Sequence, residues 1–404
     1  MMKNLLIILM AFSAYLHGSA QNNWGYFNSI DELRQYVLEN GDSSLIGLQL
    51  WSFSSFKEIE NELDVSKIKT LKVFSSKMAD LQFLKGFKNL ETLELDVKLR
   101  EFNSENLPES LEQLKISQVP KKTSNGKSSL KLKRLELGGG WKCEDVVFLA
   151  NGHSLDKLTL SSVDLVDIKC FPSPIKIRIL QLEDCEINDL DNLKAFIAVD
   201  ELKTLSISRT DFSNSVGFSS SFSKLERLTV KHCKLSSIEG LENLRNLLYM
   251  DFTNNRLDAL EVNLPRLKYL NVSNNNLKTL ILEQVDTAFA LDVSYNKLKE
   301  IKGFKPQEDR LRAFYYYGNQ SIKMVGAPYF TNIVSFSFAP QVVKLKMDTS
   351  KLEVVYDCSE SSVSIENTIR VDWNKVKKPG IRYFKARDIE EFRIVPDITP
   401  PNYL

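Results

Sequence analysis

Few residues of this chain have the types and spacing that catalysis requires. Nucleophilic triads and most zinc sites use histidine as a base or ligand, and after its first twenty residues the chain has only His153 and His232. His232 precedes Cys233, and this pair is the best candidate for a cysteine nucleophile. A nucleophilic cysteine must be exposed and ionisable, whereas the place of Cys233 in the repeat pattern described below predicts a buried thiol. We therefore expect no catalytic residue and no enzyme.

Two other segments have the composition of ligand sites without the spacing. The glycine-rich segment 138–142 (GGGWK) lacks the G-x-x-x-x-G-K-S/T pattern of a phosphate-binding loop. The acidic run between Glu183 and Asp191 lacks the spacing of a calcium-binding EF-hand loop. The first is predicted to be a turn after a strand, and the second a solvated edge. The sequence thus predicts no metal and no cofactor.

The elements that position these residues follow from an apolar pattern that returns about every 22 residues. The pattern is L-x-x-L-x-L, with Ile, Val, Phe or Met allowed, and successive copies begin 20 to 25 residues apart. The fourteen copies begin at Leu45, Ile68, Leu90, Leu111, Leu132, Leu155, Ile177, Leu202, Leu225, Leu247, Leu267, Ala288, Leu311 and Ile333. Alternation sends the Leu side chains inward and the x side chains outward, as in a β-strand. Each copy therefore predicts one strand and one short return segment, which form one coil of a solenoid.

The most regular copies continue into x-x-N/C-x-L, which is the signature of a leucine-rich repeat. The segment 238–257 (IEGLENLRNLLYMDFTNNRL) resembles the repeats of bacterial internalins, and the resemblance covers about three quarters of the chain. It implies an α/β solenoid, a leucine-rich-repeat horseshoe with a parallel sheet on its concave face. Exported members of this family typically bind proteins through that face.

Four stretches of the chain have different compositions. Residues 1–20 have the charged start, apolar stretch and small-residue end of a signal peptide. Residues 21–44 are predicted to form an N-terminal helical cap, with Ser29 as N-cap and Gly41 just past its end. Residues 45–340 hold the fourteen coils, and residues 341–404 are predicted to be degenerate repeats or a β-rich C-terminal cap and tail.

The signal peptide predicts an exported protein: secreted, periplasmic or attached to the cell surface, and bacterial. No later apolar run approaches the roughly 20 residues that a membrane-spanning helix needs, so no transmembrane segment is expected after signal cleavage. Without Lys3 the chain has 52 basic and 52 acidic residues. This balance argues against nucleic acid as a partner, because nucleic-acid-binding proteins normally carry a basic excess.

One column of the repeat, the ninth position of each coil, is predicted to be structural. It holds Cys185, Cys233, Asn255, Asn275, Asn296 and Asn319. Stacked asparagines can satisfy loop backbone groups that would otherwise be buried without partners. Cys185 and Cys233 lie two coils apart, about 10 Å, which exceeds the roughly 7 Å limit for a disulfide, so free thiols are expected. Cys143 and Cys170, in adjacent return segments, either pair with each other or stay reduced.

The outward positions of the later coils supply the candidate binding surface. Tyrosine and arginine dominate it, as they dominate interface hot spots. Its residues are Arg227, Tyr249, Asp251, Tyr269, Asn271, Asp292, Tyr315 and Tyr317. The competing interpretation is that these tyrosines are ordinary strand residues. We expect a protein partner on the concave face. The alternatives are a carbohydrate or cell-envelope polymer on the same face, or a structural role in an envelope assembly.

Charged residues form two further groups. Glu94, Lys115 and Glu136 alternate in sign on adjacent coils and are predicted to serve solubility and register. A segment without acidic residues is a second candidate surface, for an anionic partner. Its residues are Trp373, Lys375, Lys377, Lys378, Arg382, Lys385 and Arg387. The alternative is a solvated strand edge that is protected by charge.

Overall fold

The computed structural model describes parts of the chain between residues 24 and 385. The described residues are 24–41, 45–51, 53, 57–78, 80–124, 130–141, 154–165, 174–187, 190–212, 215–285, 289–303, 311–316, 318–319, 323–324, 335–338, 354–357 and 382–385. They belong to two compact units, Met1–Phe171 (unit 1) and Pro172–Leu404 (unit 2). The predicted signal peptide, His153, Cys143, Cys170 and Cys358 lie outside the described residues.

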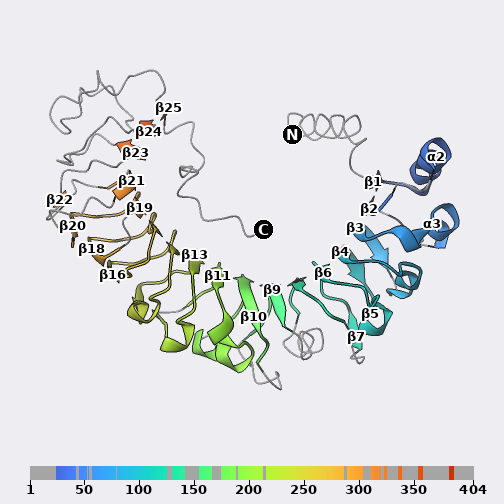
Figure 1. Ribbon diagram of the computed structural model, residues 1–404, viewed down its shortest axis with the longest axis horizontal. Coiled ribbons are helices and arrows are strands. Elements are labelled where there is room, and N and C mark those ends of the chain that lie inside the picture. The colour runs from blue at the N-terminus through green and yellow to red at the C-terminus, as the bar shows by residue number, and fades with distance from the viewer. Residues whose placement is uncertain are drawn as a thin grey trace. The chain divides into compact units, whose positions relative to one another are not determined.

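The main sheet of unit 1 consists of parallel strands, one from each coil (Figure 1). In pairing order they are β1 (Trp24–Phe27), β2 (Gly47–Trp51), β3 (Thr70–Met78), β4 (Thr92–Leu99), β6 (Gln113–Ile116), β8 (Arg134–Gly138) and β9 (Leu155–Ser161). Parallel neighbours cannot be joined by a tight hairpin, so the chain returns between them. This is the strand-and-return coil that the repeat predicts.

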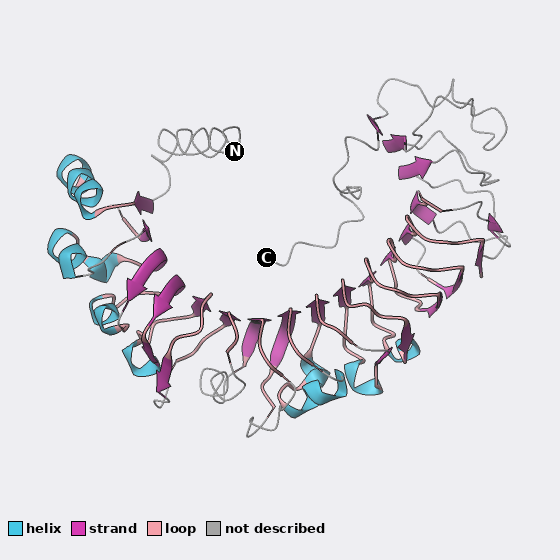
Figure 2. Ribbon diagram, turned by 180° about the vertical axis from the view of Figure 1, so that it is seen from behind, coloured by secondary structure: helices cyan, strands magenta, loops and turns pink. Residues whose placement is uncertain are grey.

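The return segments of unit 1 lie on the side of the coils opposite the main sheet (Figure 2). They contain helix α3 (Lys57–Glu62), the 3₁₀ turns η1 (Val65–Lys67), η2 (Gln82–Gly86) and η3 (Ser104–Asn106), and the paired strands β5 (Glu101–Asn103) and β7 (Lys122–Ser124). A 3₁₀ turn rises about 2 Å per residue, more than an α-helix. It therefore suits a coil that must return within few residues.

The N-terminal cap contains a strand as well as the predicted helix. Helix α2 (Ile30–Asn40) begins after Ser29, whose hydroxyl accepts the Glu32 N–H at 3.2 Å, and Gly41 follows its end with φ 73°. Leu33 is the residue of this helix whose side chain is buried. Strand β1 precedes the helix and pairs with β2. Sequence analysis had not predicted this strand, which adds two aromatic residues, Trp24 and Tyr26, to the face of the sheet.

Unit 2 repeats the same plan. Its main sheet contains β10 (Ile177–Glu183), β11 (Thr204–Ser208), β13 (Arg227–Lys231), β15 (Tyr249–Asp251), β17 (Tyr269–Asn271), β19 (Phe289–Asp292), β21 (Leu311–Tyr315), β23 (Ser335–Phe338), β24 (Val354–Asp357) and β25 (Arg382–Lys385), paired in parallel in that order. Parallel strand pairing thus extends beyond residue 340, where the repeat pattern in the sequence weakens.

The return side of unit 2 changes along the chain. Its first coils use the 3₁₀ turns η5 (Leu190–Ala195), η6 (Val199–Glu201), η7 (Ser220–Phe222) and η8 (Leu241–Asn243). The coils with η7 and η8 also contain the parallel pair β12 (Ser215–Gly217) and β14 (Ser237–Glu239). Later coils use extended segments, which form a second parallel sheet of β16 (Ala259–Asn263), β18 (Thr279–Gln284), β20 (Glu300–Lys302) and β22 (Lys323–Met324). The coils of this region, 20 to 23 residues each, therefore have a strand of one sheet on each side.

Each coil buries the Leu positions of its repeat. In unit 2 one inward column across adjacent strands has no exposed surface, and it consists of Leu228, Met250, Leu270, Leu291 and Phe314. Burying a side chain of this size contributes about 1.5–3 kcal/mol. Because each side chain packs on its counterparts in the neighbouring coils, the core is a continuous column rather than a separate core for each coil.

The asparagine column of unit 2 ties each coil to the one before it. The Asn275 side-chain amide donates to the carbonyls of Phe252, Val272 and Ser273 at 2.9–3.2 Å, and its oxygen accepts the Leu257 N–H at 3.1 Å. Equivalent hydrogen bonds are made by Asn255, Asn296 and Asn319, although the number of partners differs by one from rung to rung. All four asparagines are buried. Two partners of Asn275 belong to the preceding coil, so the column joins neighbouring coils.

The residue before this column adopts a left-handed backbone in successive coils. Non-glycine examples have φ between 53° and 58°, and they are Ser162, Asp184, Arg209, His232, Asn254, Asn274 and Tyr295. The next coil has Gly318 there, with φ 71°, and a Cβ at this position would lie 2.7 Å from the Tyr295 ring. The turn that follows each strand therefore has one repeated geometry, whichever residue type occupies it.

Candidate partner-binding surface

The solvent-facing side of each main sheet, here called the strand face, carries the residues predicted to bind a partner. In unit 2 they fall in two columns. Arg227, Tyr249 and Tyr269 are register neighbours on β13, β15 and β17, and the column continues to Ala290. The second column consists of Thr229, Asp251, Asn271, Asp292 and Tyr315. The structure thus brings seven of the eight predicted residues onto neighbouring strands, and Tyr317 lies outside the described residues.

The first column is a stack. The rings of Tyr249 and Tyr269 have centroids 4.5 Å apart and an interplanar angle of 12°. The Arg227 guanidinium lies over the Tyr249 ring, 4.3 Å from its centroid. Burial lowers the pKa of Arg227, while Tyr249 acts against this shift. Since β13 and β17 flank β15, both faces of the Tyr249 ring are covered within the chain.

Asp251 lies beneath this stack and joins it to the neighbouring strand. Its carboxylate accepts hydrogen bonds from the Tyr249 hydroxyl at 3.2 Å and from the Thr253 hydroxyl at 2.6 Å. The Lys231 ammonium lies 2.8 Å from the same carboxylate. Burial raises the pKa of Tyr249 well above its usual range, and the charge of Asp251 adds to this shift. The Tyr249 hydroxyl is therefore protonated and acts as a donor.

The acidic and amide residues of the second column have a turn-forming role that sequence analysis missed. Asp251, Asn271 and Asp292 each accept, through a side-chain oxygen, the N–H of the residue two positions later, at 2.9–3.1 Å. These are Asx turns, in which an Asp or Asn side chain hydrogen-bonds the backbone two residues onward. The repeated pattern D/N-x-S/T at residues 251–253, 271–273 and 292–294 is its sequence signal.

Several predicted contact residues are not exposed, which corrects the expectation from alternation. Relative exposure is 1 % for Asp251, 6 % for Tyr269, 5 % for Asp292 and 1 % for Tyr315. Alternation fixes the face to which a side chain points but not whether its neighbours cover it. Strands lie about 4.8 Å apart, so a tyrosine covers the adjacent strand, and a short aspartate bends back to its own turn. Arg227, Tyr249 and Asn271 keep partial exposure.

The buried Asp292 has an unusual electrostatic environment. Burial and, to a smaller extent, the charge of Asp251 raise the pKa of its carboxyl group to about 6, although the hydrogen bond from the Ser294 N–H opposes the shift. The equivalent position one coil earlier is Asn271, which makes the same backbone hydrogen bond without a charge. A charge at residue 292 is therefore not required by the turn.

The strand face of unit 1 has a different pattern. The predicted alternating charges form a continuous ladder, in which Lys72, Glu94, Lys115 and Glu136 are linked by ion pairs of 3.0, 3.3 and 2.9 Å. These side chains are partly exposed. Exposed pairs contribute about 0–1 kcal/mol each, so the ladder is a weak stabiliser.

An aromatic group at the start of unit 1 was missed by sequence analysis. Trp24 and Tyr26 stack with ring centroids 6.1 Å apart, and Trp51 and Phe74 stack at 4.6 Å. The Trp24 ring lies against Gly47, where a Cβ would be 2.7 Å away. The W-x-Y pattern, which places Trp24 and Tyr26 on one side of a strand, is the sequence signal for this group. It was missed because residues 21–44 were predicted to form a helical cap.

Cys233 and His232 do not form a nucleophile and base. Cys233 has no exposed surface, and its thiol contacts the Lys231 carbonyl at 3.0 Å. Burial raises the pKa of the Cys233 thiol to about 11, so the group is neutral at pH 7, which is the opposite of what a nucleophile needs. Cys185 is also a buried free thiol.

The basic segment near the C-terminus is only partly described. Arg382 and Lys385 begin and end strand β25. Trp373, Lys375, Lys377, Lys378 and Arg387 lie outside the described residues. The predicted anionic-surface patch remains a prediction.

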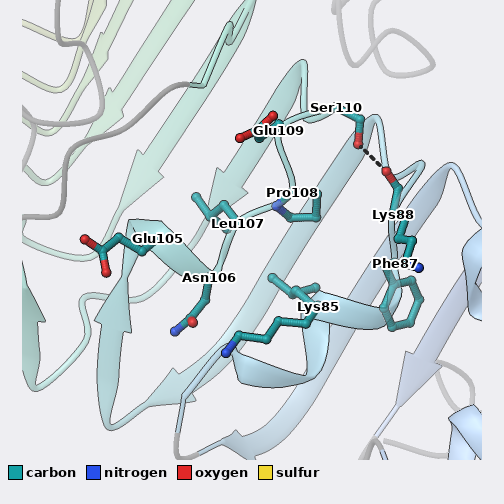
Figure 3. Close-up of a pocket in the computed structure, with 10 residues that line it drawn as sticks. Lys85, Phe87, Lys88, Glu105, Asn106, Leu107, Pro108, Glu109 and Ser110 are labelled. Atoms are coloured by element: carbon teal, nitrogen blue, oxygen red, sulfur yellow. Dashed lines mark hydrogen bonds between the residues drawn. The ribbon is translucent and has the colours of Figure 1, made fainter.

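A pocket on the return side of unit 1 lies between η2 and η3 (Figure 3). Leu84, Phe87 and Leu107 are among its lining residues and are buried. In Figure 3, Lys85 and Asn106 extend toward the same side, whereas Glu105 and Glu109 point away from them. The pocket has a volume of about 320 Å³. Its polar groups do not converge on one point, so we assign it no ligand.

Within the described part of the chain, no three His, Cys, Asp or Glu side chains are grouped to hold a metal ion. No described helix is long and apolar enough to cross a membrane.

Comparison with known proteins identified no sequence family. No family model matches the chain, and no curated protein sequence matches it. Several solved structures are similar, including the following three. YopM from Yersinia enterocolitica WA-314 has a TM-score of 0.42 and 16% identity, over 87% of this chain and 76% of that chain. The leucine-rich repeat domain of LRIM1 has a TM-score of 0.24 and 13% identity, over 75% and 76%. The plant peptide hormone receptor RGFR1, in complex with RGF2, has a TM-score of 0.27 and 14% identity, over 77% and 70%.

The class of the protein follows from its own geometry. The chain repeats L-x-x-L-x-L about every 22 residues, and each copy forms one parallel strand of a solenoid. In unit 2, buried asparagines at the ninth position of the repeat join successive coils. These features define a leucine-rich-repeat protein.

Proposed function

We propose that this chain is a non-enzymatic binding protein and that unit 2 contacts a protein partner through its strand face. The surface is narrower than the sequence predicts, and it is centred on Arg227, Tyr249, Lys231 and Asn271. The observation that carries the proposal is the stack of Arg227 on Tyr249 on Tyr269, fixed from below by Asp251.

This arrangement suits a protein interface because its side chains are already ordered. Immobilising a flexible side chain on binding costs about 0.5–1.5 kcal/mol, and here the Tyr249 ring and hydroxyl are held before any partner arrives. Tyrosine and arginine also supply large contact area with a polar tip. The buried residues Tyr269 and Asp251 then support the contact rather than make it.

The same geometry disfavours a carbohydrate on this patch. A sugar ring that packs on an aromatic residue needs an open ring face. Arg227 and Tyr269 cover the two faces of the Tyr249 ring, so only ring edges and polar tips are offered to a ligand. Export, as a secreted, periplasmic or cell-surface protein, remains part of the proposal, and it rests on the composition of residues 1–20.

The test compares Arg227→Gln and Tyr249→Ser with the matched variant Arg245→Gln, whose exposed arginine lies in a return segment. A partner is captured on immobilised protein, and its affinity for each purified variant is then measured directly. Loss of a hot-spot residue should weaken binding about tenfold or more, whereas Arg245→Gln should leave it unchanged. Thermal unfolding of each variant checks its fold. Equal affinity of all three folded variants would contradict the proposal.

A further inference from the structure

Arg227 of strand β13 has a positive charge that its described surroundings do not balance. Its guanidinium lies 4.3 Å from the centroid of the Tyr249 ring. In the described part of the chain the Arg227 side chain forms no hydrogen bond and no ion pair. The ring covers one face of the guanidinium, so the N–H donors at its edge keep no acceptor among these residues. Burial lowers the pKa of Arg227, because its charge is partly withdrawn from water.

The acidic residues near Arg227 are paired with other cations. Glu226 precedes it in the chain, and its carboxylate contacts the Lys203 ammonium at 2.8 Å. Asp251 lies on the next strand, and its carboxylate contacts the Lys231 ammonium at 2.8 Å. Neither carboxylate can therefore balance Arg227 without breaking an existing ion pair.

The ion-pair ladder of unit 1 shows what unit 2 lacks at this position. In the ladder a cation and a carboxylate are register neighbours, as Lys72 and Glu94 are, 3.0 Å apart. The register neighbours of Arg227 are Tyr249 on β15 and Thr204 on β11. Because threonine is short and uncharged, the side of the guanidinium toward β11 has no carboxylate where the ladder would place one.

The side chains beside Arg227 on the strand face carry hydroxyl groups. Thr204 and Ser206 on β11 are the register neighbours of Arg227 and Thr229 on β13, so the four residues form a two-by-two block. All four are partly exposed. The three hydroxyl groups have no hydrogen bond to another residue in the described part of the chain. Since a hydroxyl can donate to an anion, the block offers an unpaired guanidinium and three further donors.

The charge of the block fits a carboxylate better than a phosphate group. Arginine can bind one carboxylate through two parallel hydrogen bonds. A phosphate group carries a charge of about −1.5 to −2. It would find one unpaired cation in the block, with the Asp251 carboxylate on the next strand. A single negative charge is therefore the better match for Arg227.

We infer that Arg227 binds the carboxylate of an Asp or Glu side chain of the protein partner, with the hydroxyl groups of Thr204, Ser206 and Thr229 around it. This inference rests on the proposed interface of unit 2 and adds the chemistry of the group that the partner presents there. Tyr249 holds the guanidinium in place before binding, so less side-chain freedom is lost when the carboxylate arrives.

The first test uses a small probe, N-acetylglutamate α-amide, with N-acetylglutamine α-amide as its uncharged control. The whole chain is labelled with ¹⁵N-arginine, and the Nε–H resonance of Arg227, identified by its loss in Arg227→Lys, is followed by NMR at low ionic strength. The glutamate probe should shift this resonance saturably, and the glutamine probe should not. Added salt should reduce the shift, because the contact is between charges.

Arg245, an exposed arginine of a return segment, is the internal control, and its resonance should shift far less. Equal shifts of the two arginines, or no saturable shift of Arg227, would overturn the inference. Inorganic phosphate that saturates the Arg227 shift at a lower concentration than the glutamate probe would overturn the assignment to a carboxylate.

The second test supplies the carboxylate within the chain. Thr204→Glu places it at the register neighbour of Arg227, in the arrangement of Lys72 and Glu94. This variant should abolish the response of Arg227 to the glutamate probe. It should also weaken the captured partner about tenfold or more, since hydrogen bonds to charged groups are among the stronger ones. Thr204→Gln has the same size without the charge and should retain both.

These variants also separate the carboxylate from the interface itself. If Arg227→Gln weakens the partner while Thr204→Glu and Thr204→Gln affect it equally, the interface stands and the inferred carboxylate is wrong. If none of the three folded variants changes the affinity of the partner, the proposed interface is wrong, and the inference is overturned with it.

Discussion

The strand faces of the two units are stabilised by different kinds of polar interaction. In unit 1 the outward side chains of adjacent strands pair with one another, as in the ladder from Lys72 to Glu136. In unit 2 the outward Asp and Asn side chains bend back to the backbone of their own turns, and a second set of asparagines joins the coils from within. The side chains of the first device are partly exposed, and most of those of the second are buried.

This difference has an energetic consequence. An exposed ion pair is screened by water and salt and contributes little. Losing a buried hydrogen bond is costly, because the polar group that remains has neither its partner nor water to bond to. Unit 2 should therefore depend on single polar residues to an extent that unit 1 does not.

The largest expected effect is the loss of one rung of the asparagine column. Asn275→Ala would remove three hydrogen bonds to carbonyls that keep other donors, and it would leave the Leu257 N–H without its side-chain partner. Three lost hydrogen bonds at about 0.5–1.5 kcal/mol each and one unsatisfied N–H at about 1–3 kcal/mol, partly relieved by relaxation, predict a loss of about 3–5 kcal/mol. Urea unfolding measures it. Asn263→Ala, which changes an exposed residue with one contact of 3.5 Å, should be nearly neutral. A similar result for both variants would contradict the role of the column.

A smaller effect of opposite sign is expected at Asp292. Its pKa is raised from 3.8 to about 6 in the folded chain, so the folded state binds more protons than the unfolded state between these pH values. Stability should therefore fall as the pH rises through this range and stay constant above it. Asp292→Asn keeps the Asx turn, as Asn271 shows, and should raise stability at pH 8 by up to about 3 kcal/mol.

Unfolding of wild type and Asp292→Asn at pH 4 and pH 8 would test this expectation. The two curves should converge at the lower pH, because the wild-type carboxyl group is then protonated. The exposed Asp258→Asn serves as the control. A variant that is less stable than the wild type at pH 8 would show that the charge of Asp292 is useful to the fold.

The smallest effect is expected in the ion-pair ladder of unit 1. Glu94→Gln removes the carboxylate that contacts both Lys72 and Lys115, at 3.0 and 3.3 Å. The expected loss is at most about 1 kcal/mol, and it should disappear in about 1 M salt, where charges are screened over about 3 Å. The Asn275→Ala loss should persist in the same buffer. Loss of several kcal/mol in Glu94→Gln would remove the contrast between the two units.

Much of the fold could be predicted because the spacing of the repeat determines which residues face inward. Leu positions such as Leu228 and Leu270 are buried as their spacing requires, and the ninth position of the repeat holds the buried Asn column. Strand β1 was not predicted, since too few residues repeat there for the period to be read.

The candidate site was less predictable. Periodicity placed Arg227, Tyr249 and Tyr269 on one face of neighbouring strands, as found. It did not show that Tyr269 and Asp251 are covered, or that three Asx turns use the second column. The D/N-x-S/T pattern was visible in the sequence, but its meaning depends on the backbone turn that follows each strand.

The sequence by itself determined that the chain forms coils, which residues face inward, and where the asparagines stack. These properties follow from spacing along one chain, because a strand alternates its side chains and a coil repeats at a fixed length. Tertiary structure alone decided which outward residues stay exposed and that Arg227 covers Tyr249. Exposure and contact depend on the neighbouring strands, whose register is set only when the coils stack.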